Sequence, residues 1–168
     1  MKIFIASDHA GFELKERLIE HIKKNISNTN SIIDLGTNNT SSCDYPVFAN
    51  KLVQHLLENP SDSNNKNRGI LICGTGIGMS IAANRTPGIR AALCFNEEMA
   101  IMSRKHNNAN VIVFGARIIT YETAICCVEA FLHTDFDGGR HARRLTLIDS
   151  SDSKAECALD EKYMRRLA

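Results

Sequence analysis

The sequence predicts an α/β protein whose single sheet is parallel, five-stranded, doubly wound and Rossmann-like, with helices on both faces. Short apolar runs and amphipathic segments alternate five times along the chain. The apolar runs are nearly continuous, as expected for strands that are buried on both faces. The third run leads directly into a glycine-rich turn and a helix of small residues.

Five pairs of a strand and a helix account for most of the chain. The expected strands are residues 3–6, 31–35, 69–73, 89–94 and 111–114. The expected helices are residues 12–26, 47–57, a third that ends at residue 84, 97–106 and 121–133. The first helix has the clearest pattern, because Leu14, Leu18 and Ile22 recur at fourfold spacing.

Three further segments lie outside this alternation. Residues 59–67 are polar and turn-forming, and we expect an exposed loop there. Residues 137–144 are basic and are expected to be irregular, whereas residues 155–167 should form a charged helix with a thin apolar edge. We therefore expect a single domain over residues 1–148 and a C-terminal helical arm over residues 149–168 that lies on another subunit.

Composition narrows the classes of protein that fit. The chain has 168 residues, of which 43% are hydrophobic and 23% charged, and its formal net charge is +1. These values are ordinary for a soluble globular protein and favour neither a nucleic-acid partner nor a membrane surface. No apolar run could cross a membrane and charges come too early for a signal peptide, so a cytoplasmic protein is predicted. The six cysteines are expected to be free thiols that bind no metal.

Residues that follow the strands of an open parallel sheet converge at one edge and bind the ligand. Here these positions carry an acid, an imidazole, a phenol, a thiol and a guanidinium: Asp8, His9, Tyr45, Cys73 and Arg117. Cys73 is followed by three glycines at residues 74, 76 and 78, whose backbone amides can approach an anion closely. A thiol at such a turn can act as a thiolate base or nucleophile. The alternative is a small buried cysteine before an incidental turn.

Arg117, Arg140 and Arg144 lie in or near loops, and their forked hydrogen bonds suit phosphate oxygens. A solvated basic face or a nucleic-acid patch is the alternative, but only 6% of the residues are aromatic and none interrupts the basic run. A phosphorylated ligand is therefore predicted. His106, at the end of the fourth helix, could serve as an acid or simply as a polar cap. No histidine spacing typical of a metal site occurs, so no metal is predicted.

Seven motifs occur in order along nearly the whole chain, at residues 7–12 (SDHAGF), 34–37 (DLGT), 44–46 (DYP), 70–84 (ILICGTGIGMSIAAN), 103–107 (SRKHN), 114–117 (FGAR) and 138–141 (GGRH). Together they resemble type B ribose-5-phosphate isomerases and their relatives that act on other sugar phosphates. The resemblance implies interconversion of ribose 5-phosphate and ribulose 5-phosphate through an enediolate, in the non-oxidative pentose phosphate pathway and without metal or cofactor. It also implies a homodimer or tetramer in which the His106-Asn107 and Arg117 segments of one chain face the Cys73 loop of another.

The resemblance assigns a role to each motif residue. Cys73 would take a proton from the sugar carbon with Thr75 beside it, and His106 would help to open the furanose ring. The phosphate would be held by His9, Arg117, Arg140 and Arg144. The sugar oxygens and the enediolate would contact Asp8, Tyr45, Asn107 and the backbone at Gly74, Gly76, Ile77 and Gly78. One branch of the family has a glutamate base where this chain has Met79, which cannot take a proton, so Cys73 is the candidate here.

Three other functions fit the residues at this point. They are an isomerase of a six-carbon sugar phosphate such as allose or galactose 6-phosphate, a non-catalytic sugar-phosphate-binding module, and an enzyme in which Cys73 is a covalent nucleophile. The candidate acid and base argue against the binding module.

Overall fold

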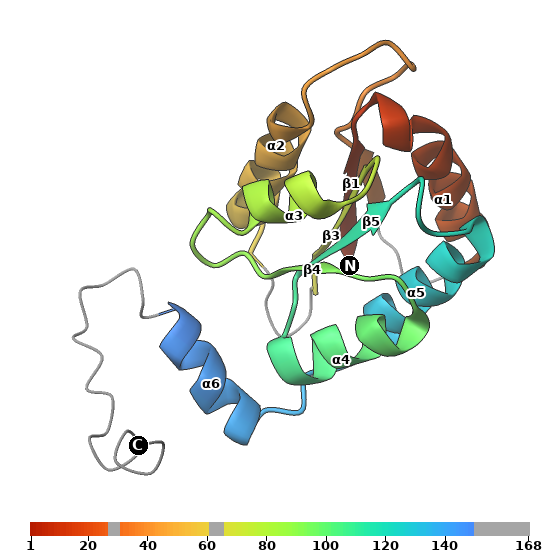
Figure 1. The fold of residues 1–168 in the computed structure, drawn as a ribbon. Helices are drawn as coiled ribbons and strands as arrows, with labels where there is room; N and C mark the ends of the chain where they lie inside the picture. Colours follow the sequence, from red (N-terminus) through yellow and green to blue (C-terminus); the bar gives the residue numbers. More distant parts are fainter. Residues whose placement is uncertain (27–30, 61–65, 150–168) are drawn as a thin grey trace, which may run out of the picture.

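A computed structural model contains the predicted sheet of five parallel strands, in the order β2-β1-β3-β5-β4 (Figure 1). The structure describes residues 1–26, 31–60 and 66–149. The strands are β1 (Lys2–Ser7), β2 (Ser31–Asp34), β3 (Arg68–Cys73), β4 (Ala91–Leu93) and β5 (Val111–Gly115). The fold class predicted from the sequence is confirmed.

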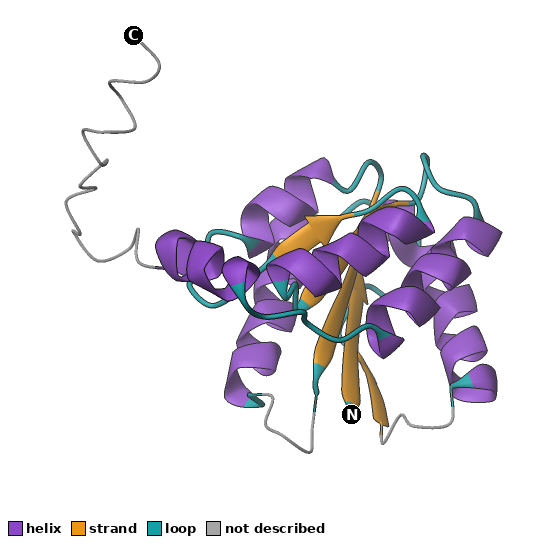
Figure 2. Cartoon of the chain, turned by 90° about the horizontal axis from the view of Figure 1, so that it is seen from below, coloured by secondary structure: helices purple, strands orange, loops and turns teal. Residues whose placement is uncertain are grey.

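Helices cover both faces of the sheet, which forms the central layer in Figure 2. They are α1 (Phe12–Asn25), preceded by the short turn η1 (His9–Gly11), then α2 (Tyr45–Glu58), α3 (Ile77–Ala83), α4 (Glu97–Asn107), α5 (Tyr121–His133) and α6 (Arg140–Asp149). Helices α2 and α3 pack on one face, and α1, α4 and α5 on the other. No helix in the described ranges is long and apolar enough to span a membrane.

Strand β3 lies at the centre of the sheet, and all six of its residues are buried. Its side chains alternate between the two faces, as strand geometry requires. Ile70 and Ile72 therefore join the core under α1 and α5, whereas Leu71 and Cys73 join the core under α2 and α3. The Cys73 side chain consequently lies on the α2 and α3 side, at the carboxyl end of the strand.

The strand order reverses direction between β1 and β3. From β1 the chain crosses to β2 on one side, and from β2 it returns to β3 on the other side. Ligands of open α/β sheets bind at such a switch point, beyond the carboxyl ends of the strands. In this protein Asp8, directly after β1, lies beside the end of β3 at the switch point. Its amide donates a hydrogen bond of 3.2 Å to the carbonyl of Ile72, the residue before Cys73.

Helix α6 differs from the sequence prediction. Residues 137–144 were expected to be irregular, which is wrong from Arg140 onward. Gly138 and Gly139, with φ of 66° and 54°, make the turn that starts the helix, and its buried residues His141 and Leu145 are one turn apart. In the sequence, the three arginines and one histidine of residues 140–144 make the short apolar edge of this helix difficult to recognise. The predicted helix at 155–167 lies outside the described residues.

Candidate active site

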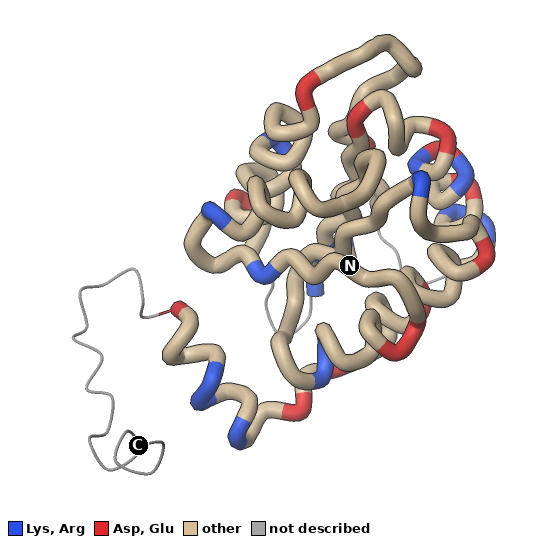
Figure 3. The backbone as a smooth tube through the Cα atoms, viewed as in Figure 1, with Lys and Arg blue, Asp and Glu red and all other residues tan. Residues whose placement is uncertain are grey.

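The Cys73 loop, residues 73–78, joins β3 to α3. The Gly76 amide donates a hydrogen bond of 3.2 Å to the Cys73 sulfur, and the thiol is only 5% exposed. An amide hydrogen directed at the sulfur stabilises negative charge on it, as proton abstraction by a thiolate requires. Figure 3 shows that the loop and α3 carry no charged residue of their own.

Glycine is required at two places where this loop meets β5. Gly76 has a φ of 79°, and a Cβ on it would lie 2.4 Å from Leu93 Cδ1. A Cβ on Gly115 would lie 2.5 Å from the Thr75 carbonyl oxygen. The close approach is held by hydrogen bonds from the Ala116 amide to the Cys73 carbonyl (2.8 Å) and from the Arg117 amide to the Gly74 carbonyl (3.0 Å). The backbone around Thr75 is therefore fixed in place.

Arg117 lies beside this loop in its own chain. A Cβ built on Gly74 would be 3.4 Å from Arg117 Nη1, so the guanidinium rests against the loop backbone. The resemblance implied that the Arg117 segment faces the Cys73 loop of another chain, and the structure shows that Arg117 also lies beside the Cys73 loop of its own chain. Its position follows from the pairing of Cys73 with Gly115, which brings the ends of β3 and β5 together.

Asp8 and His9 follow β1 at the same edge. Asp8 is 6% exposed, and its Oδ1 accepts hydrogen bonds from the amides of Ala10 (3.0 Å) and Gly11 (3.1 Å). His9 Nδ1 accepts a hydrogen bond of 3.2 Å from the Cys43 amide. Because Nδ1 is an acceptor, the neutral ring carries its proton on Nε2, which leaves a donor for a ligand. Cys43 is a contact that spacing in the sequence could not reveal.

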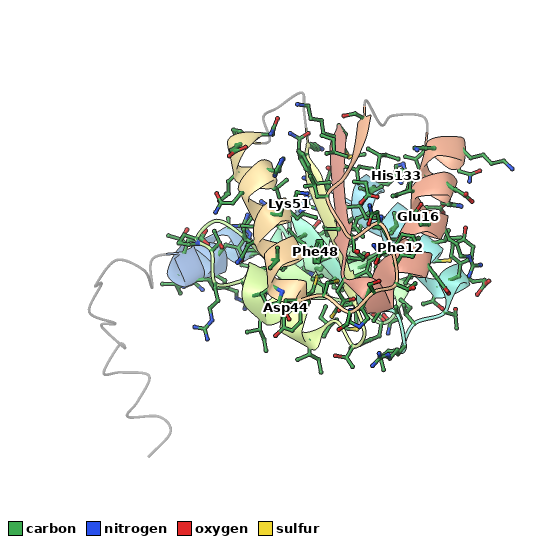
Figure 4. All side chains as sticks on the ribbon, turned by 90° about the horizontal axis from the view of Figure 1, so that it is seen from above. Phe12, Glu16, Asp44, Phe48, Lys51 and His133 are labelled. Atoms are coloured by element: carbon green, nitrogen blue, oxygen red, sulfur yellow. The ribbon has the colours of Figure 1, made fainter. Side chains whose placement is uncertain are left out.

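Tyr45 begins α2 and closes one side of the Cys73 loop. A Cβ on Gly78 would lie 2.6 Å from Tyr45 Cζ, so the phenol ring packs directly on the loop. Figure 4 shows Asp44, the residue before α2, across the strands from Phe12, the first residue of α1. Ile77 is 54% exposed, whereas Met79 is fully buried in the core. Met79, which follows the loop, is thus packed away in the core, and the loop residues that can act on a ligand are Cys73 and the exposed Thr75.

A second group of predicted site residues surrounds the end of α4. It consists of His106, Asn107, Arg140 and Arg144, joined by His141, to which the sequence assigned no role. The rings of His106 and His141 stack with centroids 4.1 Å apart and an angle of 4° between their planes. Burial, and then the neighbouring His106, Arg140 and Arg144 side chains, lower the pKa of His141. The lowered pKa favours the neutral form of the ring on which His106 stacks.

The two groups lie at opposite edges of the sheet within one chain. Cys73 ends β3, whereas Asn107 precedes the start of β5 by only a few residues. The length of β5, about 13 Å, separates these edges. Figure 1 shows α6 beside the end of α4, away from the arrowheads of the strands. The structure thus brings together Asp8, His9, Tyr45, residues 73–78 and Arg117, but not His106, Asn107, Arg140 or Arg144.

Two further thiols, Cys94 and Cys127, are buried in the core. Burial raises the pKa of Cys94 to about 12 and that of Cys127 to about 11, so both stay protonated and unreactive near neutral pH. The five cysteines within the described part of the chain are free. In the same residues, no three His, Cys, Asp or Glu side chains are grouped to hold a metal.

Comparison with known proteins shows which family the chain belongs to. A family model described as Ribose/Galactose Isomerase matches residues 3–148. The chain belongs to this isomerase family. A putative sugar phosphate isomerase of Rickettsia bellii is 47% identical over 88% of this chain and 96% of its own.

Solved structures of family members agree with the fold. Ribose-5-phosphate isomerase B of Clostridium thermocellum has a TM-score of 0.84 and 44% identity, and the match covers 92% of this chain and 99% of that one. The Mycoplasma genitalium enzyme, solved with bound ribulose-5-phosphate, has a TM-score of 0.82 and 40% identity over 91% of this chain and 97% of that one. The family region of this isomerase runs from β1 into α6, so it contains both groups of site residues.

Proposed function

We propose that this isomerase interconverts ribose 5-phosphate and ribulose 5-phosphate. The observation that carries the proposal is the Cys73 thiol at the switch point of the sheet, which accepts a hydrogen bond from the Gly76 amide. A carbonyl shift between C1 and C2 of a sugar phosphate needs a base and a place for negative charge on oxygen. The Mycoplasma genitalium relative, which binds ribulose-5-phosphate, supports the choice of substrate.

In the proposed reaction, the Cys73 thiolate removes the proton from C2 of the open-chain aldose. The resulting enediolate is stabilised by amides of Gly74, Gly76, Ile77 and Gly78, with Thr75 beside the thiol. The proton is then delivered to C1, while the hydroxyl proton on O2 moves to O1. One C–H bond breaks and another forms, so no oxidant or reductant is consumed.

We propose that the site is completed by a second copy of the chain. His106 and Asn107 cannot reach Cys73 along the length of their own sheet, but they can from a neighbouring subunit. Large apolar side chains are exposed on both elements that such a neighbour would cover, Ile77 and Ile81 on α3 and Leu147 and Ile148 on α6. A hollow of about 450 Å³ beside α6, lined by Ile89, Ala91, Leu145 and Ile148 among others, offers a surface for burial.

In this assembly His106 of the second chain opens the furanose ring, and Asn107 and Asp8 bind sugar oxygens. The phosphate is held by His9 and Arg117 from one chain and by Arg140 and Arg144 from the other. Forked guanidinium donors suit the three phosphate oxygens. The place in the non-oxidative pentose phosphate pathway, the cytoplasmic location and the independence of metal and cofactor stay predictions.

The test of the function is an assay with the five-carbon and six-carbon substrates in parallel. Ribose 5-phosphate, allose 6-phosphate and galactose 6-phosphate are each incubated with the enzyme in deuterium oxide. We expect ribulose 5-phosphate to form and to carry deuterium at C1, because the proton passes through an exchangeable thiol. Turnover of a six-carbon substrate alone would reassign the substrate, and binding without turnover would indicate a non-catalytic module.

Replacing His106 with alanine should impair a cyclic substrate more than an open-chain one. The imidazole is proposed to protonate the ring oxygen as the C1–oxygen bond breaks and the C1 hydroxyl loses its proton, a step that an open-chain aldose does not need. We expect kcat/KM for ribose 5-phosphate to fall by about a hundredfold, with a much smaller loss for 4-deoxyribose 5-phosphate, an aldose that lacks the hydroxyl needed to close a furanose ring. Equal losses for the two aldoses would point to a structural role through the His141 stack.

A further inference from the structure

A cluster of three arginines lies at the amino edge of the sheet, opposite the Cys73 loop. Arg68 is the first residue of β3, Arg90 precedes β4, and Arg104 lies in α4. Arg68 is 5% exposed and Arg104 is 3% exposed. Charged side chains are almost never buried to this degree unless a partner compensates them.

Neutral acceptors take three hydrogen bonds from Arg104 and one from Arg90. Arg104 Nε donates to the Thr134 carbonyl (3.3 Å), and its Nη1 donates to Asn108 Oδ1 (3.0 Å) and to the Ala109 carbonyl. Arg90 Nε donates to the Asn108 carbonyl at 3.2 Å. These bonds hold the two guanidinium groups in place but bring no negative charge to them.

Arg68 is the least satisfied member of the cluster. Its Nη1 donates to the carbonyl of Asn67 at 2.9 Å, whereas its buried Nε has no hydrogen-bond partner among the described residues. A buried donor without a partner costs about 1–3 kcal/mol, and more when the group is charged. The orphaned Nε of Arg68 therefore leaves this guanidinium short of acceptors among the described residues.

Positive charge exceeds negative charge around the cluster. The nearby carboxylates in the described part of the chain are Asp135, which is exposed and paired with Lys66, and Asp149, which lies 3.5 Å from Arg90. Burial, with added repulsion from Arg68 and Arg90, lowers the pKa of Arg104 to about 10. Burial also lowers the pKa of Arg68. An anion bound here would offset this excess.

Two hollows open onto Arg68. One of about 310 Å³ is lined by Arg68 and Arg90 with the polar side chains of Asn67, Asn108 and Asn110. The other, of about 410 Å³, is lined by Arg68 and Arg104 with Lys66, Asn108 and Asp135. Arg68 and Asn108 line both, so the two hollows meet at the cluster, and amide donors of asparagine supplement its guanidinium groups.

We propose that the arginine cluster binds a phosphate group, either inorganic phosphate or a small phosphate monoester, at a site separate from the Cys73 loop. The tetrahedral oxygens of phosphate match the forked donors of guanidinium groups. Cys73 and Arg117 lie at the other end of the strands, and neither hollow is lined by His106, Arg140 or Arg144, so the occupant is distinct from the substrate phosphate.

The test counts phosphate sites by equilibrium dialysis of the full-length chain against radiolabelled inorganic phosphate. The variants are Arg68→Gln, Arg140→Gln and a charge-matched control, Arg85→Gln, at an exposed arginine that lines neither hollow. We expect wild type and Arg85→Gln to bind two phosphates per chain. Arg68→Gln should bind the cluster phosphate at least about tenfold more weakly and still turn over ribose 5-phosphate. Arg140→Gln should keep the cluster site.

Competition with unlabelled glycerol 3-phosphate distinguishes a phosphate monoester from inorganic phosphate as the ligand. Displacement of the labelled phosphate from the cluster indicates a monoester site, and no displacement indicates a site for inorganic phosphate. Phosphate should also raise the Tm of wild type and Arg85→Gln more than that of Arg68→Gln. If Arg68→Gln does not fold, Arg68→Lys, which keeps a charge but not the fork, should show the same weakened binding. Wild-type binding that only Arg140→Gln removes, or unchanged binding in the Arg68 variants, would overturn the proposal.

Discussion

Replacing Cys73 with alanine is expected to lower the turnover of ribose 5-phosphate by roughly a thousandfold, because no other side chain of the loop can take the C2 proton. Binding should persist, since the phosphate contacts come from His9 and the arginines. The measurement is kcat beside the dissociation constant of ribulose 5-phosphate. The matched control is Cys126→Ala, which removes an exposed thiol on α5 and should leave both quantities unchanged.

Two results would contradict this assignment of the base. The first is substantial turnover by Cys73→Ala in the absence of any restored thiol. The second is an enzyme that survives alkylation of Cys73 but loses turnover in Asp8→Asn. Asp8 accepts two backbone hydrogen bonds, which occupy its Oδ1, and for that reason we place it in binding rather than in proton transfer.

Gly76→Ala should damage both the fold and the reaction. The residue has a φ of 79°, and its Cβ would meet Leu93 Cδ1 at 2.4 Å and the Phe114 carbonyl carbon at 3.0 Å. We expect the free energy of unfolding to drop by about 2–4 kcal/mol, from backbone strain and overpacking together. Turnover should fall by about a hundredfold, because the amide that faces the Cys73 sulfur moves.

Gly88→Ala isolates the backbone part of that effect. Gly88 has a φ of 80°, but a Cβ on it would meet only Leu57 Cδ2, at 3.8 Å, which is an ordinary contact distance. It should cost about 1 kcal/mol and leave turnover intact. Denaturant unfolding and steady-state kinetics on both variants check the comparison. Similar losses of stability and activity in the two variants would mean that the close approach of the Cys73 loop to β5 is unimportant.

The sheet and the Cys73 loop could be predicted from the sequence because their causes are local. Continuous apolar runs indicate strands buried on both faces, and a glycine run after the third strand indicates a turn too tight for a Cβ. Ligands bind beyond the carboxyl ends of the strands, and this rule correctly predicted that Asp8, His9, Cys73 and Arg117 lie together at that end of the sheet.

Other features depend on contacts between segments that are distant in the sequence. The stack of His141 on His106 requires α6 to fold back on α4, and α6 itself was missed because charged residues obscured its short apolar edge. The hydrogen bond from the Cys43 amide to His9 joins two loops. The arginine cluster is assembled from β3, α4 and the start of β4, and no spacing along the chain links these positions.

The central claim is that the Cys73 loop of one chain and the His106 end of α4 in another form one active site. Co-refolding Cys73→Ala chains with His106→Ala chains tests it most directly, because each variant alone lacks an essential group. Random pairing into closed dimers makes half of the dimers mixed, and each of these contains one intact shared site. Activity should therefore return to about a quarter of the wild-type value. Mixed dimers that form but show no activity would mean that each site is built within a single chain.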